Sequence, residues 1–270
     1  MIIPDQNAFT INRLAGSFFP FSFKTCQKER AHSLFVCAQS VVDVCALIER
    51  YALANLVVFC VEQSSQFDPQ TDQPVSLAGL AIHAKTGFSA IDSQTIILPK
   101  ANLYPLLSTF SHCNLSLFDM GSDWNEDQVI RQVLACRERD WGRGGTILSE
   151  LPASQIFLDS HDDCYLSMET FHSELPGDVF ARTLQIYTGT LLAEVHASAP
   201  DIPEMPRELL ETFWKTDSAF TMLQQAARLK NDCLQMGVSR RPYHFGEAEE
   251  YPVEFWITYE LQSRKWRVAL

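Results

Sequence analysis

The sequence has 270 residues, of which 46% are hydrophobic and 20% are charged. These proportions are typical of a folded globular chain and exclude the low-hydrophobicity, high-charge composition of a disordered protein. The formal net charge of −12, from 33 acidic and 21 basic residues, repels phosphate groups, which argues against nucleic acid and anionic membranes as partners. A basic protein or a neutral small molecule matches that charge better.

The cysteines and the first residues indicate the compartment. Eight cysteines occur without any C-x-x-C pair, and most have apolar neighbours, which is typical of reduced thiols buried as small apolar side chains. The start, MIIPDQ, lacks the basic region of a signal peptide, and no apolar run reaches the ~18 residues of a membrane helix. We therefore expect a soluble cytoplasmic protein.

The first half of the chain alternates between predicted helices and strands. Residues 33–54 carry apolar side chains at a helical period and predict a buried helix, which is followed by a strand at 56–62. The polar segment 63–76 contains two prolines and predicts an exposed loop, whose length makes it a candidate binding loop. Further strands are predicted at 76–84, 93–99 and 114–120, and further helices at 102–113 and 126–139.

The second half predicts two hairpins with helices between them. Residues 154–171 form two extended runs around a polar centre, and Asp178 caps a helix that reaches about residue 198. After a linker-like stretch at 199–206, residues 207–236 predict helical structure that ends at Gly237 as a C-cap, either as one helix or as two helices divided at KTDSA (215–219). The closing residues, from Pro252 to Leu270, predict an antiparallel hairpin in which Glu254 and Glu260 face Arg264, Lys265 or Arg267.

These elements predict an α+β fold with a mixed, largely antiparallel sheet that is packed by long helices and closes with a C-terminal β-hairpin. We expect a single domain over residues 1–270, with a weak subdivision, if any, near 140–150. A cut at the linker-like stretch 199–206 would leave only about 64 residues beyond it, which favours one domain over two.

One short stretch, DSHDDCYLSME at 159–169, is rich in side chains that bind metals or transfer protons. His161, Asp163 and His172 are candidate ligands for a divalent metal such as zinc or non-haem iron. His161, Asp163 and Glu169 are the candidate catalytic residues, acting as general bases. The favoured interpretation is a hairpin turn whose Asp and Ser side chains bond their own backbone, because turn chemistry accounts for every residue there.

The glycine cluster RERDWGRGG at 137–145 is the best candidate for an anion site. The backbone amides of Gly144 and Gly145 would cradle a carboxylate or phosphate, and Arg139 and Arg143 would pair with it. The loop matches neither a P-loop nor a dinucleotide fingerprint. A helix C-terminus with basic residues beside its last carbonyls explains the same residues and is favoured.

No Ser-His-Asp order, nucleophile elbow, zinc-protease motif or Walker motif occurs in the sequence. The sequence therefore favours a non-catalytic binding, adaptor or chaperone-like module with a protein partner. The alternative is an enzyme that acts on a small anionic substrate, with a metal held by His, Asp and Glu around 159–172. The sequence does not identify a cofactor. The His, Asp and Glu residues around 159–172 suggest a divalent metal as the candidate.

Overall fold

A computed structural model of the chain divides into two compact units. The residues that the structure describes are 21–28, 30–37, 41–60, 67–68, 73–74, 79–88, 91–108, 115–137, 146–151, 153–161, 165–193, 201–215, 217–223, 226–242 and 251–270. Unit 1 contains the described residues up to Cys26, together with Phe35–Gln39 and Pro176–Leu270, and unit 2 contains Gln27–Leu34 and Ser40–Leu175. Each unit combines helices with an antiparallel sheet, so the α+β prediction is confirmed at that level.

The sheet of unit 1 combines the beginning and the end of the described sequence. Its strand order is β15-β14-β13-β11-β1, and β12 also pairs with β13. Ser22 in β1 lies opposite Thr221 in β11, and the described strands of this unit pair in antiparallel fashion. The strands are β1 (Ser22–Lys28), β11 (Ser218–Met222), β12 (Arg228–Lys230), β13 (Cys233–Ser239), β14 (Phe255–Glu260) and β15 (Lys265–Ala269). Strand β2 (Ala31–Cys37) has residues in both units.

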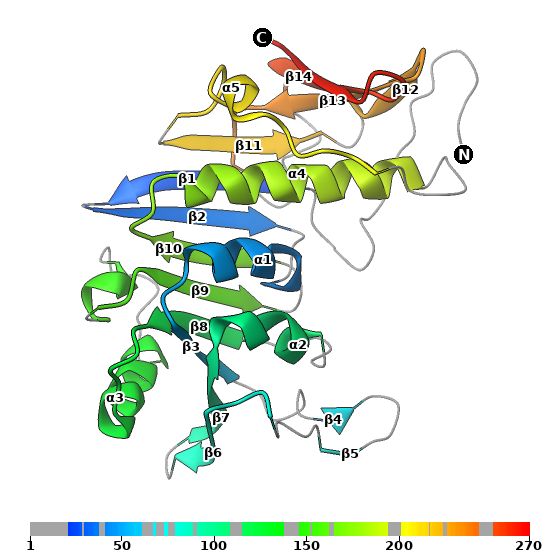
Figure 1. Ribbon diagram of the computed structural model, residues 1–270. Helices are drawn as coiled ribbons and strands as arrows, with labels where there is room; N and C mark the ends of the chain where they lie inside the picture. Colours follow the sequence, from blue (N-terminus) through cyan, green and yellow to red (C-terminus); the bar gives the residue numbers. More distant parts are fainter. Residues whose placement is uncertain are drawn as a thin grey trace. The chain divides into compact units, whose positions relative to one another are not determined.

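One long helix, α4 (Leu175–Ala193), covers a face of the unit 1 sheet (Figure 1). Its Phe180 is fully buried and meets Phe23 edge to face, with ring centroids 5.0 Å apart. Such aromatic pairs contribute about 0.5–1.5 kcal/mol each beyond the burial of their area. Other rings around Phe180 are those of Phe21, Phe213, Trp214 and Phe220. The short helix α5 (Arg207–Leu210) also belongs to this unit.

The sheet of unit 2 is buried on both faces. Alternate residues of β3 (Asn55–Cys60) point to opposite faces, and all of Leu56, Val57, Val58 and Phe59 are buried. One face packs against α3 (Glu126–Arg137) and the 3-10 turn η3 (Ile147–Ser149). Figure 1 shows α1 (Val41–Tyr51) and α2 (Leu103–Leu107) in front of the other face. A sheet covered in this way needs continuous apolar strands, and LVVF and LSLF supply them.

The remaining elements of unit 2 complete its sheet, whose order is β10-β9-β8-β3-β7-β6. These strands are β6 (His83–Phe88), β7 (Ile91–Pro99), β8 (Leu115–Met120), β9 (Ile156–His161) and β10 (Tyr165–Thr170). A separate pair is formed by β4 (Phe67–Asp68) and β5 (Gln73–Pro74), and a 3-10 turn, η2 (Lys100–Asn102), precedes α2. The predicted loop 63–76 thus contains two short strands, and its other residues lie outside the described part of the chain.

The predicted helix at 33–54 is wrong in its first part. Residues Ala31–Cys37 form β2, and the helix begins only at Val41. Apolar residues in SLFVC fit either period in so short a stretch, and the aromatic and β-branched pair Phe35-Val36 favours a strand.

The predicted helix at 207–236 is also wrong, because among the described residues of this range only Arg207–Leu210 form an α-helix. The following residues form β11, β12 and β13, and Gly237 lies inside β13 instead of capping a helix. A Cβ on Gly237 would lie 2.6 Å from the Ala226 Cβ and 2.9 Å from the Val253 Cγ2. This glycine is required by close packing between neighbouring segments, which a helical pattern in the sequence does not reveal.

Two further predictions concern the chain as a whole. Among the described helices, none has both the length and the apolar character that a membrane crossing requires. Cys26, Cys45, Cys136 and Cys233 are free thiols.

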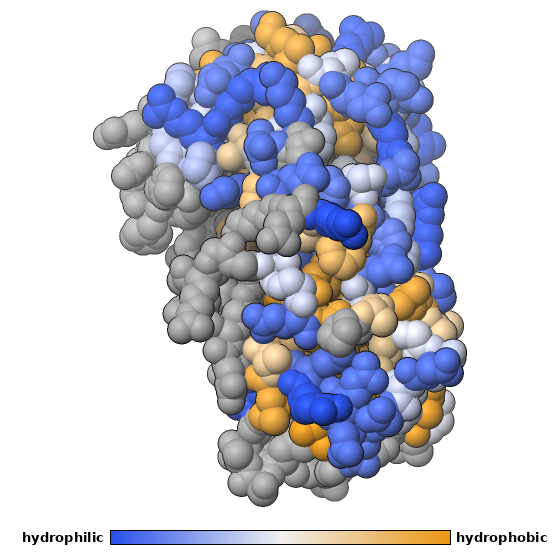
Figure 2. All heavy atoms as spheres, turned by 90° about the vertical axis from the view of Figure 1, so that its left-hand side faces the viewer, coloured by the Kyte–Doolittle hydropathy of each residue, from blue (hydrophilic) through white to orange (hydrophobic). Residues whose placement is uncertain are grey.

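On the side of the molecule shown in Figure 2, hydrophilic residues make up most of the described surface, and hydrophobic residues lie between them in smaller groups.

Candidate protein-binding surface

Only part of the predicted metal and catalytic site falls on described residues. His161 is the last residue of β9 and is described by its backbone alone, and Asp163 lies outside the described residues. Glu169 lies in β10, and His172 follows that strand. Within the described part of the chain, no three His, Cys, Asp or Glu side chains are grouped to hold a metal. The metal site at His161, Asp163 and His172 stays a prediction.

The predicted anion site stays a prediction for the same reason. Arg139, Arg143, Gly144 and Gly145 all lie outside the described residues. The helix before them, α3, ends at Arg137, close to the predicted end at residue 139.

Glu169 is a buried carboxylate with a structural partner. Its side chain is only 5% exposed, and its Oε2 accepts the backbone N–H of Leu148 at 3.1 Å. Leu148 belongs to η3, and Glu169 lies opposite Phe157 in the β9–β10 hairpin. The carboxylate therefore joins η3 to the sheet of unit 2, which supports a role in the fold of this unit.

The structure adds a second buried carboxylate, Asp119 in β8. Its Oδ1 accepts the backbone N–H groups of Gln155 at 2.7 Å and Ile156 at 2.9 Å, where β9 begins. Burial raises the pKa of Asp119 above its ordinary value of 3.8, although these N–H groups, that of Leu53 and the neighbouring His172 act in the opposite direction. A lone Asp in the apolar run LSLFDM was the signal in the sequence, and our sequence analysis did not use it.

His172 lies close to Asp119 and packs against Tyr51, with ring centroids 5.2 Å apart. Its Nε2 and the Oδ2 of Asp119 are buried and have no hydrogen-bond partner among the described residues. Its backbone N–H is bonded to the Thr170 Oγ1 at 3.0 Å. The hydrogen bonds that Asp119 accepts hold the backbone in place where β9 begins. We therefore assign Asp119 and His172 a structural role in unit 2.

A basic surface lies on the outer face of the unit 1 sheet. Thr188 of α4 contacts Met236, so the neighbouring residues of β13, Gln235 and Gly237, point away from α4. The register places Arg228, Gln235, Thr258 and Arg267 side by side on that outer face, and Lys230, Cys233, Glu260 and Lys265 in the next row. We call this surface the basic sheet face and define it by Arg228, Lys230, Lys265 and Arg267 with Gln235, Trp256, Thr258 and Glu260 between them.

The basic residues flank a polar strip. Arg228 and Lys230 lie on β12, and Lys265 and Arg267 lie on β15, with β13 and β14 between them. All four basic residues are exposed. Three strand spacings separate the two pairs by about 14 Å, and the two residues of each pair are about 7 Å apart along their strand. The face thus presents two parallel edges of positive charge.

Contacts within the face fix some of its side chains and leave others available. The Arg228 Nε donates to the Gln235 Oε1 at 2.9 Å, and its guanidinium lies 4.2 Å from the centre of the Trp256 ring. Arg267 pairs with Glu260 at 3.0 Å, while its side chain stays 68% exposed. A hydrogen bond from Ser263 and the charges of Arg267 and Lys265 lower the pKa of Glu260.

The charge of the face is opposite to that of the chain. Glu260 is the one carboxylate on the described strands of this face, and Asp232 lies in the adjoining turn, where it accepts a hydrogen bond from Gln262 at 2.8 Å. Lys230 and Lys265 make no ion pair with any described residue. A chain with a net charge of −12 therefore keeps a surface on which basic residues outnumber carboxylates.

A tight turn brings β12 and β13 together in this arrangement. Asn231 and Asp232 both have positive φ, 51° and 58°, and connect β12 to β13 as a two-residue hairpin turn. Asn and Asp tolerate that conformation best among residues other than glycine. The pair Asn231-Asp232 between alternating apolar residues was the sequence signal for this hairpin, and the helical interpretation of 207–236 concealed it.

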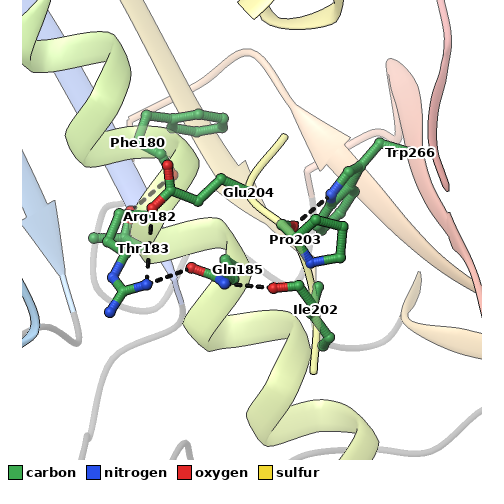
Figure 3. Close-up of polar contacts among 8 residues, drawn as sticks. All are labelled: Phe180, Arg182, Thr183, Gln185, Ile202, Pro203, Glu204 and Trp266. Carbon is green, nitrogen blue, oxygen red and sulfur yellow. Dashed lines mark hydrogen bonds and ion pairs between the residues drawn. The ribbon is translucent and has the colours of Figure 1, made fainter. Parts of the chain in front are cut away.

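A segment of extended chain, Asp201–Pro206, supports β15 from the inner side, and we call it the strap (Figure 3). The Gln185 side-chain amide of α4 donates to the Ile202 carbonyl, and the Trp266 indole of β15 donates to the Pro203 carbonyl at 2.9 Å. Arg182 pairs with Glu204 at 3.7 Å. The strap therefore links α4 to β15 and gives the basic sheet face a fixed backing.

Exposed apolar residues offer a weaker basis for a binding site. The large apolar side chains that the structure shows as exposed are Ile82, Tyr104, Phe171, Val253 and Leu270. Single exposed apolar residues are normal on protein surfaces.

Comparison of the chain with protein-family models, with curated proteins and with solved structures finds no match in any of the three. The chemistry of the basic sheet face therefore carries the functional proposal.

Proposed function

We propose that the protein is a non-catalytic binding module that holds an acidic segment of a protein partner on the basic sheet face. The observation that carries this proposal is the set of four exposed basic residues on β12 and β15, against Glu260 as the one carboxylate on the described strands of this face. Opposite charge on a partner favours both encounter and correct orientation.

A protein segment fits this surface better than a nucleic acid. A long polyanion would also meet the remainder of a chain whose net charge is −12, and that repulsion opposes its binding. A short acidic segment can stay on the face, which is about 14 Å wide. Charges more than a Debye length away, about 8 Å at physiological ionic strength, then contribute little. The net charge of the whole chain suggested a basic partner. We propose an acidic one instead, because the charges at the contact surface determine which partner binds there.

The strength of the interaction depends on several contacts acting together. An exposed ion pair contributes only about 0.2–1 kcal/mol, so no single base of the face is sufficient. Trp256 lies among the basic residues and is half-buried, which gives the partner an aromatic surface as well as charges.

The test uses the full chain and fluorescein-labelled peptides that are rich in glutamate, in lysine or in serine. We expect the glutamate peptide alone to bind, with affinity that falls as salt is added. Replacing Arg228, Lys230, Lys265 and Arg267 by glutamine should weaken that binding by about tenfold or more.

A matched variant controls for the change in net charge. Lys24 and Arg131 are also exposed but lie outside the basic sheet face. The double variant Lys24→Glu with Arg131→Glu lowers the net charge by as much as the four glutamine substitutions do, and it should bind the glutamate peptide as the wild type does. Equal losses in both sets of variants would contradict the proposal, and so would tighter binding of a single-stranded oligonucleotide than of the acidic peptide.

A further inference from the structure

Strand β15 lies at the edge of the basic sheet face, where no second strand adjoins it in the described part of the chain, and helix α5 lies close to it. Strand β15 is the last strand of the unit 1 sheet, and among the described strands it pairs only with β14. An antiparallel edge strand directs the N–H and C=O groups of alternate residues away from its neighbour, where another strand can bond them. Among the residues that the structure describes, no backbone hydrogen bond joins β15 to the strap.

The strap contacts the side chains around β15 and not its backbone. The Asp201 carbonyl accepts from Arg264 at 2.7 Å, and the Pro203 carbonyl accepts from the Trp266 indole at 2.9 Å. These bonds hold the hairpin in place while the backbone groups at the edge of β15 keep their bonding capacity. An edge that is fixed in advance loses little conformational entropy when a further strand binds.

The side chains of β15 alternate between two environments. Lys265, Arg267 and Ala269 are exposed on the basic sheet face, whereas Trp266 is 7% exposed and Val268 is half-buried on the other side. A strand added beside β15 would follow the same alternation, because strands in a sheet share their pleat. Every second residue of that strand would lie about 5 Å from Lys265 or Arg267, measured between Cβ atoms.

On the basis of the proposed function, we infer that the partner's acidic segment is extended and adds to the sheet as a strand beside β15. Its acidic residues occupy every second position and pair with Lys265 and Arg267. The residues between them are apolar and lie beside Val268 and Trp266. The recognised pattern is therefore acidic, apolar, acidic, and the backbone bonds to β15 supply the part of the affinity that charge does not.

Three peptides of equal charge separate strand addition from simple attraction. The first alternates glutamate with valine, the second has the same composition with its glutamates in one block, and the third is the alternating peptide with every second amide N-methylated. Each is titrated into the full chain by isothermal calorimetry. We expect the alternating peptide to bind about tenfold more tightly than the blocked one. The N-methyl groups are placed on the odd amides in one preparation and on the even amides in another, and the pattern that blocks the amides facing β15 should weaken binding by about tenfold.

Charge reversal at each edge of the face then locates the binding. Lys265→Glu with Arg267→Glu should weaken the alternating peptide by about tenfold or more, and Arg228→Glu with Lys230→Glu should weaken it by only about threefold. Lys24→Glu with Arg131→Glu controls for net charge. In hydrogen exchange, the amides of β15 should become protected when the alternating peptide binds.

The outcomes distinguish the two proposals. If the alternating and blocked peptides bind equally, and both edges of the face matter equally, strand addition is overturned while the binding function stands. If no acidic peptide binds, the proposed function itself fails. If the wild type self-associates through β15 and the peptide competes with that association, the occupant is a second copy of the chain, which also overturns the inference.

Discussion

The Asp119 carboxylate accepts the backbone N–H of Gln155 at 2.7 Å, so a side chain of β8 fixes the residue that leads into β9. The same oxygen accepts the N–H of Ile156 at 2.9 Å. Asp119→Ala removes the acceptor for both groups and should lower the free energy of unfolding by about 2–4 kcal/mol. Asp119→Asn retains an oxygen and should cost less than about 1 kcal/mol. Urea unfolding at neutral pH measures both, with the exposed Asp123→Ala as control, and equal costs for the two Asp119 variants would refute the role.

The pH dependence of stability should reveal the same residue. Because burial raises the pKa of Asp119 above 3.8, the folded chain retains a proton that the unfolded chain releases. That contribution is fully present below pH 3.8 and is lost as pH rises through the folded-state pKa. Asp119→Asn removes the titration, so the difference in free energy of unfolding between the variant and the wild type should shift in favour of the variant as pH rises above about 4. Urea midpoints of both proteins at several pH values test this, and a difference that does not change with pH would be the contrary result.

Gly237→Ala should destabilise unit 1. The new methyl group would lie 2.6 Å from the Ala226 Cβ and 2.9 Å from a Val253 methyl, so the neighbouring segments must move apart. Overpacking of this kind costs about 1–3 kcal/mol. Gly121→Ala is the control, since nothing lies within 4 Å of its Cβ position. The two variants are compared by thermal unfolding, and a similar melting temperature for both would contradict the packing role of Gly237.

Glu169→Gln distinguishes a structural carboxylate from one that participates in a metal site. The glutamine oxygen can still accept the Leu148 N–H, so we expect a cost below about 1 kcal/mol, whereas Glu169→Ala should cost about 1–3 kcal/mol. Any shift of the melting temperature on adding zinc should be the same in Glu169→Gln as in the wild type. His161→Ala is measured in parallel, and loss of a zinc-dependent shift in both variants would support the metal site instead.

Elements with one dominant pattern were predictable from the sequence. The strand at 114–120, the helix at 126–139 and the hairpin at 154–171 are confirmed as β8, α3 and β9–β10. In the closing hairpin, Glu260 pairs with Arg267 as predicted. Glu254 instead accepts the backbone N–H of Arg240 at 3.0 Å, because it precedes β14 and lies beside the end of β13.

The basic sheet face could not be predicted in the same way. Its charges come from residues 228–230 and 265–267, and only the pairing of β12, β13, β14 and β15 brings them onto one surface. The helical interpretation of 207–236 placed Arg228 and Lys230 on a different kind of element. Short apolar runs such as SAFTM and CLQMGVS fit a period of 3.6 about as well as a period of 2, and tertiary pairing decided between them.

The pairing of Ser22 with Thr221 has a consequence for the growing polypeptide on the ribosome. Strand β1 emerges first, yet its partner β11 is translated only after all of unit 2 has been made. During this interval Phe21 and Phe23 lack the aromatic neighbours that bury them in the folded unit. Residues 40–175 have already left the exit tunnel and can fold before unit 1 is complete. Closing so long a loop is entropically costly, so completion of unit 1 should be the late step of biosynthesis and the interval in which the nascent chain is most vulnerable to aggregation.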